Sequence, residues 1–251
     1  FMITAFYEID EYIIKQQKSI YGQAKIDFYK SLIQYSGDIY IFGDEISKIP
    51  LVLMNHEVKR INSFENNVLN NGDIVVIEWK DFESVWKTNK FTLKNRFGNT
   101  FIAEFHDEII YGHDYSLAQN NLLIMPESHI YELDESAYWN AEETLKVVFN
   151  LEKSDFICTV KNRCLIPFNN LSINQIPIDI KVNGNYIDTI VIDDNNQEEV
   201  SFTITREFLQ DGVNVFEFIP QAVWTPSEYG SKDTRMLSFP IEVFEFKEIK
   251  R

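Results

Sequence analysis

The chain has 251 residues with 39 acidic and 23 basic side chains, a formal net charge of −16, and 45% of its residues are hydrophobic. That hydrophobic content can bury a sizeable core, and we expect two domains. The excess negative charge repels phosphate backbones, which excludes nucleic acid as an expected partner. The net charge is −4 over residues 1–110 and −12 over residues 111–251, so we expect the domain boundary near residue 110.

The first 110 residues have the pattern of an α/β domain. Apolar residues at near-helical spacing predict helices through Tyr7–Ile14 and Ala24–Ile33. The apolar runs Ile39–Phe42 and Asp73–Trp79 predict buried parallel strands, with a crossover helix at Ile46–Val58 between them. The rest of this domain is expected to be one more helix and two short strands: Phe82–Trp86, Phe91–Leu93 and Phe101–Phe105.

Residues 111–251 have the pattern of an antiparallel β-sandwich. Seven segments alternate or run apolar and predict strands: 144–151, 156–160, 176–182, 186–192, 198–204, 212–218 and 241–246. Asn183-Gly184 favours a tight hairpin turn, because these residues adopt positive φ angles. The predicted class is therefore α+β, with a small α/β domain (1–110) followed by an antiparallel β-sandwich of jelly-roll or Ig-like type (111–251).

No constellation of residues has the spacing that a particular catalytic chemistry demands. The four histidines stand singly, and glycine-rich nucleotide loops are absent, so we expect no metal and no cofactor. Asp44 and Glu45 follow a predicted strand end; a ligand site there is the alternative to a helix N-terminus, which we favour. Asp193 to Asn196 lacks the glycine and terminal glutamate of a helical calcium loop and is expected to be a solvated hairpin tip.

Two further features concern the environment of the chain. Cys158 and Cys164 lie on one predicted hairpin, where only some registers permit a disulfide, so the redox compartment stays open. No apolar run reaches the roughly 18 residues that span a bilayer, and no signal peptide opens the sequence. We expect a soluble piece of a longer protein.

Several short motifs carry a resemblance to a known family. An aromatic pair, Tyr138-Trp139, precedes the first long strand, and Val182-Asn-Gly-Asn185 follows. The tail then contains these residues before the final strand: Pro226, Ser231, Asp233, Arg235 and Leu237. This order is similar to a β-sandwich module at the extracytoplasmic ends of bacterial membrane-embedded glycosyltransferases and related surface-polysaccharide proteins. The chain departs from the family at Ser238, where a glycine is usual, and at Ala137-Tyr138, where a glycine two residues before the tryptophan is usual.

The resemblance implies a non-catalytic accessory region that binds or positions a glycan or a lipid-linked sugar. It further implies a place at the periplasmic or extracellular face of a bacterial membrane, with the catalytic, membrane-embedded part outside this chain. The membrane would then be a partner only through that missing part.

A sugar site needs an aromatic plane with polar groups around it. Candidates for such a site are Trp139, Tyr138, Trp224, Tyr229, Asp233 and Arg235. Tryptophans in a β-sandwich are more often buried, and the extended spacing of Asp233 and Arg235 favours a structural pair over a ligand contact.

Two other function classes stay open. One is a protein-docking module that uses exposed sheet edges and does not bind sugars. The other is a stand-alone carboxylate-dependent enzyme using Asp44, Glu45 or Glu78, although the N-terminal domain is small for an independent active site.

Overall fold

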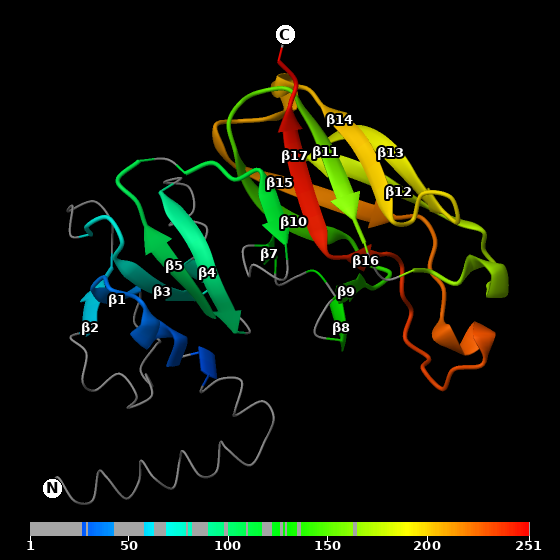
Figure 1. Cartoon of the computed structure of the whole chain (residues 1–251), viewed down its shortest axis with the longest axis horizontal. Coiled ribbons are helices and arrows are strands. Elements are labelled where there is room, and N and C mark those ends of the chain that lie inside the picture. Colours follow the sequence, from blue (N-terminus) through cyan, green and yellow to red (C-terminus); the bar gives the residue numbers. More distant parts are fainter. Residues whose placement is uncertain are drawn as a thin grey trace, which may run out of the picture. The chain divides into compact units, whose positions relative to one another are not determined.

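The protein is described by a computed structural model in which the chain forms two compact units, Phe1–Ile109 (unit 1) and Ile110–Arg251 (unit 2) (Figure 1). The structure describes residues 27–28, 30–42, 58–62, 69–78, 80–81, 90–97, 100–108, 110–116, 122–125, 128, 130–134, 137–162 and 165–250. Across these ranges no helix is both long enough and apolar enough to cross a lipid bilayer.

Unit 1 contains a mixed five-stranded sheet with the order β2-β1-β3-β5-β4. Its strands are β1 (Ile39–Phe42), β2 (Val58–Ile61), β3 (Ile74–Glu78), β4 (Phe91–Phe97) and β5 (Thr100–Phe105). β1 pairs in parallel with both β2 and β3, and the parallel arrangement of β1 and β3 was predicted from their apolar runs. β5 is antiparallel to β3 and β4. A buried hydrophobic cluster packs on this sheet, and the 3-10 turn η1 (Leu32–Gln34) contributes Leu32 to it. Its other buried members are Phe28, Ile39, Ile41, Ile74, Val76 and Ile102.

The approach to β3 depends on glycine and a buried carboxylate. A Cβ on Gly37 would lie 2.1 Å from the Gly72 carbonyl oxygen, so only glycine fits there, and Gly72 itself has a φ of +88°. The buried Asp73 carboxylate accepts hydrogen bonds from the backbone N–H groups of Asp38 (3.1 Å) and Asn70 (2.7 Å). These contacts join the segments leading into β1 and β3.

The predicted α+β class, with an α/β first domain, is wrong. Strands dominate the described residues, and no complete α-helix is among the described elements. Val58, the expected end of the crossover helix, begins strand β2, because a short apolar pattern alone does not distinguish a helix from a strand. The helices expected at 7–14 and 82–86, and residues 46–57, lie outside the described residues. Of the helix expected at 24–33, residues 27, 28, 30 and 31 are helical and η1 follows.

Unit 2 is built on two antiparallel sheets. Sheet I has the order β13-β12-β15-β10-β7 and sheet II the order β14-β11-β17-β6. Sheet I contains β7 (Leu123–Ile124), β10 (Leu145–Leu151), β12 (Gln175–Val182), β13 (Asn185–Asp193) and β15 (Gly212–Pro220). Sheet II contains β6 (Asp114–Ser116), β11 (Phe156–Lys161), β14 (Glu199–Ile204) and β17 (Val243–Glu248). Short 3-10 turns occur at η3 (Phe168–Asn170), η4 (Arg206–Phe208) and η5 (Pro226–Tyr229). A third, smaller sheet has the order β16-β9-β8, with β8 (Ile130–Asp134), β9 (Ala137–Asn140) and β16 (Pro240–Ile241).

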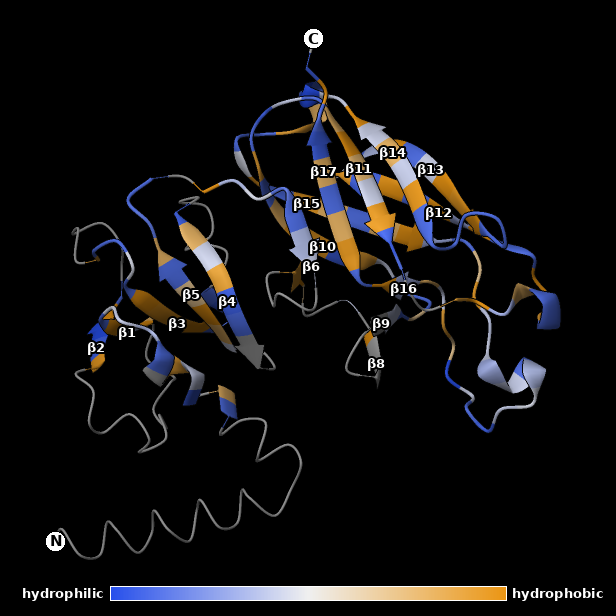
Figure 2. Cartoon of the chain, viewed as in Figure 1, coloured by the Kyte–Doolittle hydropathy of each residue, from blue (hydrophilic) through white to orange (hydrophobic). Residues whose placement is uncertain are grey.

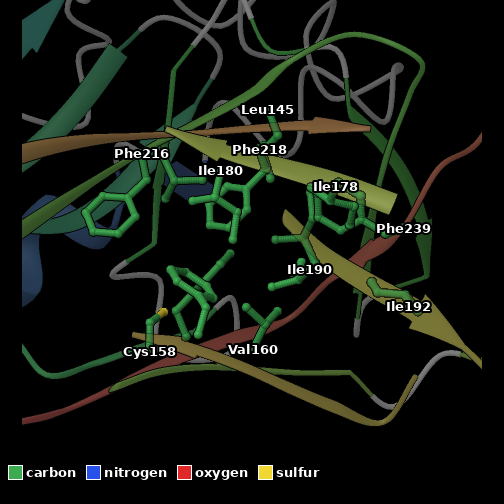
Figure 3. Packing of buried hydrophobic residues seen from close by; sticks show 14 of the residues in the cluster. Leu145, Cys158, Val160, Ile178, Ile180, Ile190, Ile192, Phe216, Phe218 and Phe239 are labelled. Atoms are coloured by element: carbon green, nitrogen blue, oxygen red, sulfur yellow. The ribbon is translucent and has the colours of Figure 1, made fainter. Parts of the chain in front are cut away.

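The two larger sheets enclose one core, so the predicted β-sandwich is confirmed. In β12 the residues alternate between buried and half-buried positions, and the stripes along the strands in Figure 2 follow this period of two. The side chains of Phe216 and Phe218 from sheet I and of Cys158 and Val160 from sheet II belong to the same buried cluster (Figure 3). Phe149 packs at its centre, with its ring 4.8 to 5.1 Å from those of Tyr115, Phe216, Phe244 and Phe246.

The hairpin predicted at Asn183-Gly184 is present between β12 and β13. Asn183 has a φ of +50° and Gly184 a φ of +80°, the pair of left-handed residues that a two-residue turn with the twist of the sheet requires. The Asn183 amide donates to the Phe208 carbonyl (2.9 Å) and to Asn214 Oδ1 (2.9 Å), and its oxygen accepts the Val215 N–H (3.0 Å). The turn is therefore held by its side chain as well as by its backbone.

Cys158 faces the sandwich core as a free, fully buried thiol. Cys164 lies outside the described residues. Burial raises the pKa of the Cys158 thiol well above its ordinary value, because the low-dielectric core disfavours the thiolate.

Candidate functional site

The segment between β15 and β16 forms a long loop whose two ends meet at Trp224 and Leu237. These residues exchange two backbone hydrogen bonds of 2.9 Å each. Residues 225–236 between them therefore form one closed loop, which includes η5. Three of the predicted site residues, Tyr229, Asp233 and Arg235, belong to it.

Trp224 is anchored in the body of unit 2. Its indole Nε1 donates to the Ser238 carbonyl (3.0 Å), and its ring lies edge-on to that of Trp139, with centroids 5.4 Å apart. Both indoles are buried, with exposed fractions of 3% for Trp224 and 6% for Trp139. The two tryptophan side chains therefore belong to the buried packing of unit 2, and a sugar could not reach their rings.

Strand β9 and the end of the loop are joined by hydrogen bonds across 98 residues of sequence. Trp139 pairs with Pro240, and Asn140 accepts the Ser238 N–H (2.8 Å) on its backbone oxygen. The Asn140 amide also donates to the Ser238 hydroxyl (3.2 Å), and that hydroxyl donates to the Asn140 carbonyl (3.1 Å). Ser238, the position that departs from the family pattern, is thus a buried hydrogen-bonding residue in this chain.

The sequence Thr225-Pro-Ser-Glu-Tyr-Gly230 determines η5 locally. Pro226 occupies the first turn, where its fixed φ is favourable, and Glu228 Oε1 accepts the Thr225 N–H (3.0 Å) in a capping-box arrangement. Gly230 ends the turn in the left-handed region, with a φ of +93°. Tyr229 therefore lies between the residues that start this turn, Thr225 and Pro226, and the glycine that ends it, Gly230.

Glu228 also fastens the turn to a distant segment. Its Oε2 accepts both the hydroxyl (2.8 Å) and the backbone N–H (3.2 Å) of Ser172. The Ser172 hydroxyl, followed by the Thr225 and Ser172 backbone N–H groups, lowers the pKa of Glu228. Neither Glu228 nor Ser172 was predicted as a site residue, although the Thr-x-x-Glu spacing at 225–228 is a signal for a capping box.

Tyr229 is the exposed aromatic residue of this cluster. Its side chain is 45% exposed, and its ring lies 6.1 Å from that of Trp224 with 35° between the planes. The structure thus brings together Trp139, Trp224 and Tyr229, which we call the aromatic cluster. Only the last of the three presents a ring to solvent.

Asp233 and Arg235 bind each other, as their spacing predicted for a structural pair. Arg235 Nε lies 3.0 Å from both Asp233 carboxylate oxygens, and Nη2 lies 2.5 Å from Oδ2. The Arg235 side chain, followed by its backbone N–H, lowers the pKa of Asp233. The Asp233 N–H in turn donates to the Ser231 hydroxyl (3.1 Å). The pair fixes the second half of the loop.

The remaining candidates contribute no further site. The backbone of Tyr138 pairs with Ile241 and Glu132, and its side chain lies outside the described residues. Within the described ranges, no group of three or more His, Cys, Asp or Glu residues could hold a metal ion. The expected hairpin tip at Asp193–Asn196 is wrong, because the turn there connects β13 of sheet I to β14 of sheet II; the Asn196 side chain and the Asn195 N–H bond to Asp193 within it. Asp44 and Glu45 are not among the residues that the structure describes.

The sequence matches no family model and no curated protein. Solved structures that resemble the chain include an acetyl xylan esterase from the rumen bacterium Butyrivibrio proteoclasticus, with 9% identity and a TM-score of 0.33 over 55% of this chain. A family 35 carbohydrate-binding module from an environmental isolate has 9% identity and a TM-score of 0.28 over 50% of this chain. An exo-β-1,3-galactanase from Phanerochaete chrysosporium has 12% identity and a TM-score of 0.31 over 62%.

This chain spans 34% of the esterase and 40% of the galactanase, but 91% of the carbohydrate-binding module. At TM-scores of 0.33 or less, the likeness is too weak to carry an argument about the function of this chain.

Proposed function

We propose that unit 2 binds an uncharged glycan through the exposed ring of Tyr229. The observation that carries this proposal is the aromatic cluster, in which Tyr229, a residue that is 45% exposed, lies beside the buried Trp224 indole with ring centroids 6.1 Å apart. An aromatic ring offers a flat apolar face to the C–H groups of a pyranose, and the phenol oxygen adds a polar contact. A fixed ring costs less entropy on binding than a mobile one.

The polar side chains of the loop that carries the ring are consistent with this reading. Ser227, Glu228, Asp233 and Arg235 belong to that loop, and hydrogen bonds to Thr225, to Ser172 and to one another hold them in place. The acidic balance of the chain, −16 overall, disfavours anionic glycans, so the proposed ligand is a neutral one.

The wider role follows the family resemblance of the sequence. We assign the chain to an extracytoplasmic accessory region of a bacterial surface-polysaccharide glycosyltransferase, where it would hold the growing glycan or a lipid-linked sugar near a catalytic part. Expression of the full-length parent with a tag on this region, followed by protease treatment of spheroplasts with an intact inner membrane, tests that location. Cleavage without lysis supports it, and protection contradicts it.

A screen against immobilised glycans tests the binding itself. The wild-type chain, Tyr229→Ala and Tyr229→Phe are compared on neutral and anionic bacterial polysaccharides, with the melting temperature of each variant measured first. The proposal expects binding to a neutral glycan that is lost in folded Tyr229→Ala and largely kept in Tyr229→Phe. Equal binding by the wild type and Tyr229→Ala refutes the site.

The alternative function, docking of a partner protein through an exposed sheet edge, is disfavoured at one edge of sheet I. Three backbone groups of the edge strand β13 are bonded to side chains. Asn196 bonds the Val191 carbonyl (2.7 Å) and the Asp193 N–H (2.9 Å). The Thr189 N–H donates to the Asp188 carboxylate (2.8 Å). Edges occupied in this way do not offer a free template for a partner strand.

A further inference from the structure

A second exposed tyrosine, Tyr186, lies on the outer face of sheet I. Its side chain is 56% exposed, more than that of Tyr229. The register between β12 and β13 shifts between Ile180 and Lys181, and beyond this irregularity Tyr186 pairs with Lys181 of β12, which pairs with Glu217 of β15. Thr189 of β13 pairs with Asp179 of β12.

A chain of hydrogen bonds fixes this tyrosine. Its hydroxyl lies 2.7 Å from Thr189 Oγ1, which donates to Asp179 Oδ1 (2.6 Å), and Gln221 Nε2 donates to Asp179 Oδ2 (3.0 Å). A carboxylate only accepts, so the single proton of Thr189 goes to Asp179. Tyr186 therefore donates to Thr189, and its phenol oxygen keeps a lone pair for an incoming donor.

The position of Thr189 also sets the direction of the ring. Because Tyr186 bonds to a residue three positions further along its own strand, the ring lies along β13 instead of extending away from it. The residue remains 56% exposed in this position. The Asp179 carboxylate and the Gln221 amide are fixed by this chain of hydrogen bonds, and Lys181 and Glu217 lie on the neighbouring strands.

From this arrangement we infer that the outer face of sheet I at Tyr186 is a second binding surface for a neutral hexose chain. The surface combines one aromatic plane with fixed donors and acceptors, the composition of a site that orients a polyhydroxylated ligand. The polar groups interrupt any contiguous apolar area, which a protein-docking face would need. The ligand class rests on the proposed function, whereas the surface and its residues are independent of the Tyr229 site.

The two surfaces share no residue. Tyr229 lies beside Trp224 on a turn that the Glu228–Ser172 hydrogen bonds fasten, whereas Tyr186 bonds to Thr189, which Asp179 and Gln221 hold in turn. A chain with both surfaces is expected to bind two separate ligand molecules, or one long glycan more tightly than a short one.

Isothermal titration calorimetry of the full chain with neutral hexasaccharides tests the inference. The probes are cellohexaose, maltohexaose and mannohexaose, and the variants are Tyr186→Ala, Tyr186→Phe and Tyr229→Ala. Tyr111→Ala is the control, since Tyr111 is an exposed tyrosine (39%) of unit 2 away from either set of residues. Circular dichroism checks the fold of each variant.

We expect two binding events per wild-type chain and one in Tyr186→Ala, with at least about a tenfold loss of affinity at the affected site, equivalent to ~1.4 kcal/mol. Tyr186→Phe is expected to weaken that site several-fold, because the ring stays while its hydrogen bond to Thr189 is lost.

The outcomes separate the two claims. An unchanged titration of Tyr186→Ala overturns this inference, and if Tyr229→Ala then loses binding, the proposed function stands alone. Binding that depends on Tyr186 and not on Tyr229 upholds this inference and overturns the Tyr229 site. If the wild-type chain binds none of the three probes, both claims are overturned.

Discussion

The ring of Tyr229 rests against the indole of Trp224, with centroids 6.1 Å apart and 35° between the planes. The indole is itself held by the Ser238 carbonyl and by the ring of Trp139. The exposed Tyr229 ring thus packs against a buried indole, which other buried residues of unit 2 hold in place. This relationship separates two roles that the sequence could not assign: Trp139 and Trp224 support, and Tyr229 faces solvent.

Substitution of Trp224 is expected to lower the stability of the fold, in addition to any effect on glycan binding. Trp224→Ala should lower the free energy of unfolding by about 3 to 5 kcal/mol, because it empties a buried aromatic site. Trp224→Phe keeps most of the packing but leaves the Ser238 carbonyl without its donor, which costs about 1 to 3 kcal/mol. Urea unfolding followed by circular dichroism measures both. A Trp224→Ala chain as stable as the wild type would show that the indole is not part of the core.

The link between Glu228 and Ser172 predicts a dependence on pH. Hydrogen bonds lower the pKa of Glu228 from its ordinary value of 4.5, so its contribution is fully present above that value and is lost as the pH falls through the lowered pKa. The melting temperature of Glu228→Gln should therefore be lower than that of the wild type at pH 6. The difference should shrink below about pH 4. Differential scanning calorimetry from pH 2.5 to 6 checks this.

Asp233 should behave in the same direction, because Arg235 lowers its pKa, so the calorimetry includes Arg235→Gln as a matched variant. A difference between Glu228→Gln and the wild type that stays constant down to pH 2.5 would contradict the role of the Glu228 carboxylate.

Much of unit 2 could be predicted from the sequence, since the strands from residue 144 onward alternate with a period of two and are bounded by strong turn signals. Asn183-Gly184 predicted its hairpin because left-handed φ angles are required there. The short strands β6 to β9 were not predicted. β6 and β9 pair with the distant strands β17 and β16, β8 pairs only with β9, and their own sequences carry little signal.

In unit 1 the apolar run at Ile39–Phe42 predicted a strand correctly, but Val58 was assigned to a helix. The sheet partner that makes Val58 a strand residue is Ile39, and this contact is invisible to a local pattern. The candidate site shows the same limit. The aromatic residues were identified from their type, whereas the burial of the tryptophans and the support under Tyr229 come from tertiary contacts.

The hairpin turn offers a separate test of what its side chain contributes. Asn183→Gly keeps the positive φ but removes the bonds to Phe208, Asn214 and Val215, and should cost about 1 to 3 kcal/mol. Gly184→Ala keeps those bonds and should cost about 1 to 2 kcal/mol through its left-handed backbone. Thermal denaturation ranks the two. If Asn183→Gly is neutral, the side-chain bonds contribute nothing to stability.

The buried thiol of Cys158 is expected to resist modification in the folded protein. Burial raises its pKa, so little thiolate forms at neutral pH, and the sulfur is not exposed. Iodoacetamide should label Cys158 in urea and not in native buffer, as measured by peptide mass spectrometry. Labelling at the same rate in both conditions would contradict the packing of Cys158 in the core.

The most direct test of the central claim is a titration of the chain with a neutral oligosaccharide from the glycan screen, followed by tryptophan fluorescence. The ring centroids of Trp224 and Tyr229 lie 6.1 Å apart, so ligand stacking on the tyrosine ring should change the indole emission in a saturable way. The same titration of folded Tyr229→Ala should show no such change, with binding weakened about tenfold or more. A Tyr229→Ala chain that titrates like the wild type would contradict the assignment of Tyr229 as the glycan-binding ring.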